Sequence, residues 1–406
     1  MNLHFVTSQF KKSLSHIQRE GVRSFSKILL KRFRSSRSVF LKPDVINAYR
    51  FLNFTPTVAL PDSILAARHR IINWYMPALG KGSGGHLNIF RFLGYLQRNG
   101  FVNNVIISDD DSGLSAIRTA ALIKEWYDLD GITVYFLDQP VPSASFSIAT
   151  SWKSAYAVRN LVAATHKIYF VQDFEPWFFP AGTEAALAEQ TYHFGFHGIT
   201  AGTWLAQRLA SEYGMSTTAL GFSYDRRLYK PYPRSSHQTG KRIFFYVRPP
   251  TARRAFDLGV MVFAELAKRR PDITVVMAGW DVRHYALPFP CDHAGLQDPG
   301  QLAALYSSCD AALVLSFTNV SLLPLEIMAC GVPVVSNTGP YAEWLLNGQI
   351  AKLAVPSVAM MADALEDVLY TPGEGDRLRR NAMCFAQATS WDQEGQRMLT
   401  ALEHML

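Results

Sequence analysis

The arginines that follow an apolar run near residue 245 have the type and spacing to bind a phosphorylated ligand. The segment FFYVRPPTARRAFDLG (244–259) places Arg248 at the end of that run, with Arg253 and Arg254 a few residues further on. Guanidinium groups match the geometry of phosphate oxygens and can neutralise a diphosphate that leaves in a group transfer. The alternative interpretation is a basic loop exposed to solvent.

A second segment, SFTNVSLLPLEIMACGVPVVS (316–336), combines a polar turn with a carboxylate. It predicts a turn after a strand over 311–315, a helix that opens near Ser321 and ends at Gly331, and a strand from Val332. Amides of such a turn and the helix dipole favour a phosphate, and a carboxylate in the helix can accept hydrogen bonds from ribose hydroxyls. The residues expected to contact this ligand are Thr318, Asn319, Val320, Ser321, Leu322 and Glu326. A core-packing helix with a solvated Glu326 is the alternative.

The segment VQDFEPWFFP (171–180) crowds two carboxylates among aromatic side chains after a predicted strand. A carboxylate in such surroundings can hold and deprotonate a sugar hydroxyl. We therefore name Asp173, before Glu175, as the candidate base. The alternative is a capped turn whose aromatic rings belong to the core. The nearby His193 and His197 are expected to be structural.

The glycine-rich stretch LGKGSGGHLN (79–88) admits two interpretations. Gly80, Gly82 and Gly85 satisfy G-x-G-x-x-G between a predicted strand and a helix, with Asp109 at the end of the next strand, which is close to a dinucleotide-binding fingerprint. That interpretation predicts an NAD(P)-dependent oxidoreductase. In the favoured one, which a family resemblance carried by other segments of the chain implies, the backbone at Gly84 and Gly85 approaches phosphates at a helix N-terminus near His86.

Neither the acidic residues nor the cysteines predict a metal site. Asp109, Asp110 and Asp111 are adjacent, and acids before a helix more often cap it, here near Leu114, than bind a metal. The four cysteines (Cys291, Cys309, Cys330 and Cys384) show neither paired nor metal-type spacing. We expect no metal and no bound cofactor, and a reducing, cytoplasmic setting.

These segments must be positioned by alternating strands and helices. Apolar runs predict strands at 71–75, 104–108, 132–137, 168–172, 198–201 and 217–220, and then at 243–247, 273–278, 311–315 and 332–335. Helical patterns between them include 114–127, 153–164, 255–269 and 299–307. The alternation predicts an α/β protein with two doubly wound, Rossmann-like domains that face each other across a cleft. The expected division is an N-terminal extension at 1–60, a first domain at 61–225, a linker at 226–240, a second domain at 241–385 and a last helix at 386–406.

Composition fits two domains and locates the charge. The chain has 406 residues, of which 49% are hydrophobic, enough for two cores. It has neither an apolar run long enough to span a membrane nor the apolar core of a secretory signal at its N-terminus. The net charge is +7, but residues 1–43 contain ten Lys or Arg and one acid, so the rest of the chain carries −2. This distribution argues against a nucleic-acid-binding protein.

The basic excess coincides with an amphipathic pattern. In EGVRSFSKILLKRFR (20–34), apolar residues recur at helical spacing and Lys or Arg occupy much of the remaining surface. Such a helix suits an anionic membrane surface, and we expect peripheral association with the inner face of the cytoplasmic membrane as one of two outcomes. The other is a helix that packs on the protein body with its basic face in solvent.

The two segments described first resemble the donor-binding region of retaining GT-B glycosyltransferases. In that family two glutamates lie eight positions apart around a helix start; Glu326 matches the second, which binds the ribose, whereas Thr318 replaces the first. The sequence at 248–256 is similar to R-P-x-x-x-R-x-A-F of the WsaF-like rhamnosyltransferase branch. The resemblance also assigns Gly279 and Leu296 to the nucleotide and makes residues 386–406 a helix that crosses back to the first domain.

The resemblance implies a function in sugar transfer. It implies a nucleotide-sugar donor such as dTDP-rhamnose, retention of anomeric configuration, and a growing bacterial surface polysaccharide or lipid-linked glycan as acceptor. It gives Arg248 and Arg253 to the diphosphate, the first domain to the acceptor and the second to the donor. Because Thr318 replaces a glutamate, a catalytically silent protein that binds sugar nucleotides is a further alternative.

Overall fold

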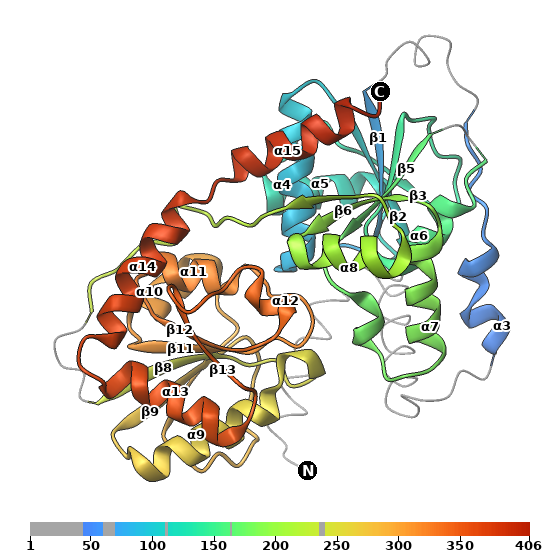
Figure 1. The fold of residues 1–406 in the computed structure, drawn as a ribbon. Helices are drawn as coiled ribbons and strands as arrows, with labels where there is room; N and C mark the ends of the chain where they lie inside the picture. The colour runs from blue at the N-terminus through green and yellow to red at the C-terminus, as the bar shows by residue number, and fades with distance from the viewer. Residues whose placement is uncertain (1–43, 60–69, 110–112, 163–164, 235–239) are drawn as a thin grey trace, which may run out of the picture.

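The computed structural model describes residues 44–59, 70–109, 113–162, 165–234 and 240–406. The basic segment 20–34 lies outside these residues. Two parallel sheets organise the described chain, each with helices on both faces (Figure 1). Short elements precede the first sheet, namely α3 (Val45–Ala48) and η1 (Arg50–Asn53).

The N-terminal domain is built on a seven-stranded sheet in the order β3-β2-β1-β4-β5-β6-β7. Its strands are β1 (Ile71–Pro77), β2 (Val102–Asp109), β3 (Thr133–Phe136), β4 (Phe146–Ala149), β5 (His166–Val171), β6 (His197–Ala201) and β7 (Thr217–Leu220). The helices of this domain are α4 (Gly84–Arg98), α5 (Ala116–Tyr127), α6 (Trp152–Arg159), α7 (Thr183–Gln190) and α8 (Thr203–Tyr213), with the short turns η2 (Glu175–Phe178) and η3 (Thr191–His193). The central strands are buried on both faces, as parallel strands covered by helices must be.

The C-terminal domain repeats the plan with a six-stranded sheet in the order β10-β9-β8-β11-β12-β13. Its strands are β8 (Lys241–Tyr246), β9 (Ile273–Ala278), β10 (Cys291–Gly295), β11 (Ala311–Val314), β12 (Val334–Asn337) and β13 (Ala351–Ala354). Its helices are η4 (Ala252–Arg254), α9 (Phe256–Arg269), α10 (Pro299–Ser307), α11 (Leu323–Ala329), α12 (Pro340–Glu343), α13 (Val358–Tyr370) and α14 (Glu374–Ala388).

The last helix, α15 (Trp391–Glu403), lies on the N-terminal domain beside α4 (Figure 1). Met398, Leu399 and Leu402 from this helix join the apolar cluster that covers one face of the first sheet. Glu394 accepts a hydrogen bond from the backbone nitrogen of Gly221 at 2.6 Å. The chain therefore passes between the domains a second time before α15.

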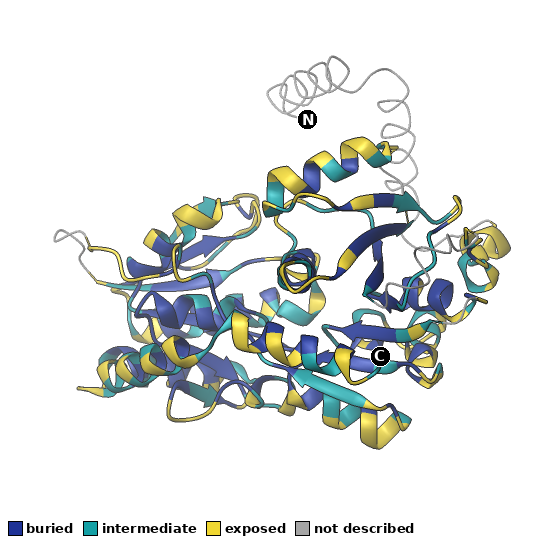
Figure 2. Ribbon diagram, turned by 90° about the horizontal axis from the view of Figure 1, so that it is seen from above, coloured by how far each residue is buried: buried dark blue, intermediate teal, exposed yellow. Residues whose placement is uncertain are grey.

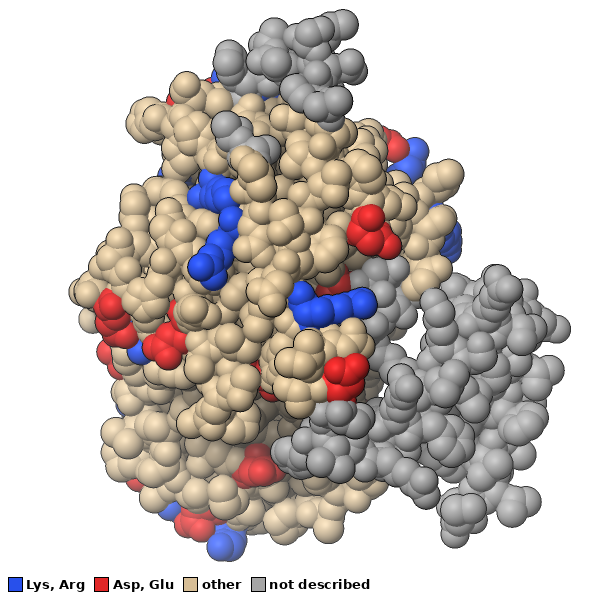
Figure 3. All heavy atoms as spheres, turned by 90° about the vertical axis from the view of Figure 1, so that its right-hand side faces the viewer, with Lys and Arg blue, Asp and Glu red and all other residues tan. Residues whose placement is uncertain are grey.

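Buried and charged residues are distributed as the sequence suggests for the described chain. In Figure 2 the strands are largely buried, and exposed residues follow the outward turns of the helices. On the face shown in Figure 3, Lys and Arg are scattered among uncharged residues. The described residues of this face form no continuous basic area, in contrast to the concentration of Lys and Arg in the sequence of residues 1–43.

The sequence predicted ten of the thirteen strands that the described residues form. It missed β4, β10 and β13, which are four or five residues long. Residues of β10 read CDHAG, with no apolar run, because this strand lies at the edge of its sheet. The expectation that acidic residues cap the helix near Leu114 is wrong: α5 is capped by Ser115, which accepts from the Arg118 amide at 3.2 Å. Asp110 and Asp111 lie outside the described residues.

Candidate active site

Asp173 joins the two domains at the carboxyl end of β5. Its carboxylate accepts a hydrogen bond from the Thr318 hydroxyl at 3.0 Å and from the Asn319 backbone nitrogen at 2.7 Å. A third bond, at 2.9 Å, comes from the backbone nitrogen of Phe174. Both donors from the C-terminal domain belong to the turn after β11, so the carboxyl ends of the two sheets meet here.

The arginines of η4 complete this contact. The Arg253 Nε lies 3.5 Å from the Asp173 carboxylate, and its guanidinium stacks over the Phe178 ring at 3.9 Å. Burial raises the pKa of Asp173, although the charges of Arg253 and Arg254 lower it. Because both carboxylate oxygens already accept hydrogen bonds, this arrangement does not fit the expected role of Asp173 as a base; here the carboxylate links the domains.

Glu175 is also unsuited to contact an acceptor. It is buried, and its carboxylate accepts from the backbone nitrogen of Trp152 at 2.9 Å and from the Tyr169 hydroxyl at 2.8 Å. Burial raises its pKa to about 7. These partners all belong to the N-terminal domain, so Glu175 fixes the loop that carries Asp173.

Asn319 uses all its hydrogen-bonding groups within the protein. Its side-chain nitrogen donates to the carbonyl oxygens of Gln172 at 2.9 Å and Ala201 at 2.7 Å, and its side-chain oxygen accepts from the Trp344 indole at 2.7 Å. Its carbonyl accepts from the Ser316 hydroxyl at 3.0 Å. Each polar group of Asn319 thus has a partner within the protein, and the expected contact of this residue with the donor stays a prediction.

The other predicted amide donors divide into two groups. The Val320 backbone nitrogen donates to the Tyr341 carbonyl at 2.9 Å, so it too is occupied. The expected contact of the Val320 amide with a phosphate stays a prediction. Ser321 and Leu322 lie directly before α11, and their amides are the remaining candidates in this turn for a contact with phosphate.

Three guanidinium groups gather where β8 ends. Arg248 follows this strand and is exposed, whereas Arg253 and Arg254 are partly buried. The positive charge of Arg248 helps to lower the pKa of Arg253 and Arg254, after burial and despite the attraction of Asp173. Like charges held this close are stabilised by an anion placed between them. The structure thus brings together the arginines that the sequence singled out.

Glu326 lies in the first turn of α11 and is half-buried. Burial raises its pKa to about 7, against the opposing influence of the Arg91 charge and the Tyr229 hydroxyl. Arg91 belongs to α4 of the N-terminal domain, and no ion pair joins it to Glu326 among the described residues. A carboxylate so placed is ready to accept hydrogen bonds, and the alternative of a fully solvated Glu326 is excluded.

The glycines predicted to approach the ligand occupy two different places. Gly279 ends β9 with φ +115, and a Cβ there would lie 2.5 Å from the Tyr246 ring. Gly84 and Gly85 open α4, which Ser83 caps, and the Gly85 carbonyl accepts from the Gln172 side chain at 3.1 Å. The start of α4 therefore lies beside the loop that carries Asp173. Leu296, after β10, is 83% exposed.

The glycine-rich stretch does not form a tight strand-to-helix turn. β1 ends at Pro77 and α4 begins at Gly84, so Gly80 and Gly82 lie in the connection between them. Gly85 is already inside the helix. A dinucleotide fingerprint needs its first glycine directly after the strand, and this geometry does not favour that interpretation.

Sequence reasoning missed Asn88, Arg91 and Tyr229. The first two are polar residues in a helix whose other buried positions are mostly apolar, which was the signal available. Tyr229 falls in the stretch interpreted as a linker, yet its ring is buried in the core of the C-terminal domain. Their importance depends on how the domains meet, which no local pattern states.

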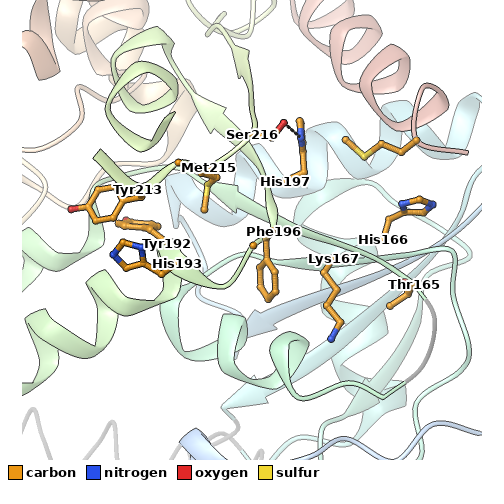
Figure 4. A pocket seen from close by; sticks show the side chains of 13 residues that line it. Thr165, His166, Lys167, Tyr192, His193, Phe196, His197, Tyr213, Met215 and Ser216 are labelled. Atoms are coloured by element: carbon orange, nitrogen blue, oxygen red, sulfur yellow. Dashed lines mark hydrogen bonds between the residues drawn. The ribbon is translucent and has the colours of Figure 1, made fainter. Parts of the chain in front are cut away.

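A cavity of about 720 Å³ lies at the opposite end of the first sheet (Figure 4). It is lined at the amino ends of β5, β6 and β7, and His166, Lys167 and His197 contribute to its wall. The ammonium of Lys167 donates to two backbone carbonyl oxygens, and both ring nitrogens of His197 contact hydroxyl groups. Ligands of parallel α/β sheets bind at the other edge, so we do not assign the site here.

Residues 241–366 match the family described as WsaF, C-terminal domain. The O-antigen biosynthesis protein RfbC of Myxococcus xanthus is 35% identical over 354 residues, which is 83% of this chain and 27% of that protein. This chain therefore spans about a quarter of the length of the curated relative that it matches.

Solved structures share the two-domain arrangement. Sucrose-phosphate synthase from Thermosynechococcus elongatus has a TM-score of 0.63 at 13% identity, with 83% of this chain and 99% of that chain covered. Anabaena HepE in complex with UDP-glucose has a TM-score of 0.64 at 17% identity, with 83% and 100% covered. WaaG, a glycosyltransferase of lipopolysaccharide biosynthesis, has a TM-score of 0.60 at 11% identity, with 82% and 99% covered. The chain has the GT-B fold.

The GT-B fold expected from the sequence is thus confirmed. Within it, the contacts of Asp173, Arg253 and Asn319 lie where the carboxyl ends of the two sheets meet. No helix of the described residues is long and apolar enough to cross a membrane. No cluster of potential metal ligands occurs among those residues either.

Proposed function

We propose that the protein is a retaining glycosyltransferase that transfers a sugar, rhamnose from dTDP-rhamnose, to a bacterial surface polysaccharide or a lipid-linked glycan. The observation that carries the proposal is the gathering of Arg248, Arg253 and Arg254 near the end of β8, where Arg253 pairs with Asp173 of the N-terminal domain. The GT-B fold, the match to the WsaF C-terminal domain and the O-antigen name of the Myxococcus relative support it.

The arrangement suits departure of a diphosphate. In the proposed reaction, the bond between the sugar and the diphosphate oxygen breaks, and a bond from an acceptor hydroxyl oxygen to the same carbon forms on the same face. The acceptor proton passes to a phosphate oxygen, which becomes more basic as the bond breaks. Arg248 and Arg253 stabilise the negative charge that develops on the diphosphate. This scheme needs no carboxylate base, in agreement with the engaged carboxylate of Asp173.

Glu326 is assigned to the pentose of the nucleotide. Replacing it with alanine leaves the hydroxyl partners unpaired, so the variant is expected to bind the donor more weakly by about 1–3 kcal/mol. Isothermal titration with the nucleotide diphosphate measures the difference. An unchanged affinity in Glu326→Ala would remove Glu326 from the site.

The first experiment is thermal stabilisation by a panel of nucleotides. The panel contains dTDP, UDP, GDP, their sugar conjugates, NAD and NADP, without added metal. A shift with nucleoside diphosphates, followed by transfer or hydrolysis of the matching sugar nucleotide, is the expected result. A shift with NAD or NADP alone would overturn the proposal, and binding without any turnover would indicate a silent sugar-nucleotide-binding protein.

Residues 20–34 support a proposed location beside a lipid-linked acceptor. Their basic and apolar pattern favours anionic lipid, with about 1 kcal/mol from each Lys or Arg near the surface. Flotation with phosphatidylglycerol vesicles is expected to carry the full-length protein upward at low salt. Lys27→Gln combined with Lys31→Gln should reduce that fraction, and equal flotation with phosphatidylcholine vesicles would contradict an electrostatic contact.

A further inference from the structure

One face of α4 carries polar residues toward the C-terminal domain. Gly84, Asn88 and Arg91 lie four and three positions apart, so they share one side of the helix. The first of them has open space in front of it, because a Cβ built there would meet no atom within 4 Å. The last reaches Trp391 at the start of α15, with its guanidinium 4.7 Å from the ring centroid. This face therefore points to the boundary between the domains.

Two polar atoms on this face are buried without a partner. Asn88 is 7% exposed; its side-chain nitrogen donates to Gln172 at 3.1 Å, but its side-chain oxygen has no hydrogen-bond partner among the described residues. The Nη1 of Arg91 is likewise buried and, within the same part of the chain, unpartnered. Such groups cost stability, and folded proteins seldom leave them unpaired.

Glu326 belongs to α11 of the other domain, and within the described chain its carboxylate and the Arg91 guanidinium stand further apart than an ion pair. The charge of Arg91 lowers the pKa of this carboxylate, which burial raises. Two residues of the segment between the domains also affect the pKa of this carboxylate: Tyr229 lowers it and Asp225 raises it. A hydroxyl group fits such a gap, since its oxygen can accept from a guanidinium while its proton is donated to a carboxylate.

We propose that Arg91 and Asn88 form the N-terminal half of the donor site, with the 3′-hydroxyl of a nucleoside diphosphate held between the Arg91 guanidinium and the Glu326 carboxylate. The Asn88 oxygen accepts a hydrogen bond from a hydroxyl of the sugar that the nucleotide donor carries. This inference rests on the proposed function and extends it: the pentose is bound by both domains at once.

The test is isothermal titration of the full chain with UDP and dTDP, each compared with its 3′-deoxy analogue. The wild type is expected to bind the hydroxylated nucleotide at least about tenfold more tightly than its deoxy analogue, the effect of one hydrogen bond to charged groups. In Arg91→Gln this ratio falls toward one. Arg98→Gln is the matched control, because Arg98 lies in the last turn of α4 with its guanidinium over Tyr95, and its ratio should stay that of the wild type.

A variant in the other domain, Glu326→Gln, tests the same contact if Arg91→Gln fails to fold. Glu326→Gln should lose the same discrimination, and the double variant should lose no more than either single one, because both contact one hydroxyl. A wild-type ratio retained in Arg91→Gln, or a wild type that does not distinguish the analogues, would overturn this inference while nucleotide binding still supports the proposed function. Absence of all nucleotide binding by the wild type would overturn both.

Discussion

The two domains meet in two regions that differ in how their polar groups are partnered. At the carboxyl ends of β5 and β6, Asn319 has a partner for each of its donors and acceptors, and three of those partners belong to the other domain. Along α4, Asn88 and Arg91 also reach the boundary, but each has a buried atom that no described residue satisfies.

The first region therefore holds the two domains together, whereas the second has buried polar groups that a ligand can still bind. Paired buried groups fix one relative position of two bodies, since any shift would leave several of them unsatisfied. Unpaired groups reduce stability unless something else binds them, and folded proteins tolerate this mainly where they function. We therefore interpret Asn319 as the fixed point of the interface and the Arg91–Glu326 gap as its ligand-binding side.

Replacing Asn319, the fixed point of the interface, should lower the free energy of unfolding the most. Asn319→Ala leaves the carbonyls of Gln172 and Ala201 and the indole of Trp344 without partners, so the free energy of unfolding should fall by about 3 kcal/mol or more. Urea denaturation followed by tryptophan fluorescence measures it. Asn381→Ala is the control, since its single bond to the Gln349 carbonyl is exposed, and equal losses in both variants would contradict this interpretation.

On the ligand-binding side of the interface, Glu326 should make the free energy of unfolding depend on pH. The pKa of Glu326 is raised from 4.5 to about 7, so the folded protein retains a proton that the unfolded chain releases. The resulting stability is complete below about pH 4.5 and is lost as the pH rises through about 7, with a total of up to about 3 kcal/mol. Glu326→Gln should flatten the decline in unfolding free energy between these pH values.

Part of the decline in unfolding free energy with pH should remain in Glu326→Gln. The pKa of Glu175 is also raised to about 7 by burial, so its contribution is lost over the same interval. Urea denaturation at a series of pH values gives both slopes. Identical slopes in wild type and Glu326→Gln would show that Arg91, Asp225 and Tyr229 do not leave Glu326 in the environment described here.

A smaller effect is expected where the two domains pack closely beside Asn319. Gly202 has φ +95, and a Cβ there would lie 2.5 Å from the Trp344 ring, so Gly202→Ala should lower the free energy of unfolding by about 2 kcal/mol. Gly195→Ala is the matched control, because φ is +74 and no atom lies within 4 Å of the new Cβ. It should cost only about 1 kcal/mol, for backbone strain alone. Equal melting temperatures for the two variants would contradict the close contact.

The sequence predicted the framework because long apolar runs bury a strand on both faces. It also located the chemistry at strand ends: Arg248 after β8, Asp173 after β5 and Glu326 after β11 all lie close to the boundary. Parallel sheets place such ends on one edge, so local patterns were sufficient.

The pairing of these residues could not be predicted in the same way. Asp173 and Asn319 are 146 positions apart and belong to different domains, and their hydrogen bond exists only through the docking of two separately folded sheets. The same docking turns Asp173 from a candidate base into a link between domains. Asn88 and Arg91 remained unnoticed because a polar residue in a helix predicts solvent exposure until its neighbours are known.

The position of α15 has a consequence for the order in which the protein is made. The first sheet needs Met398, Leu399 and Leu402 to complete its apolar cluster, and these residues are translated after the whole C-terminal domain. A nascent N-terminal domain on the ribosome therefore presents an uncovered apolar surface beside α4 for about 180 codons after β7 emerges. The apolar cluster of the first sheet is therefore complete only once α15 has emerged and packed beside α4.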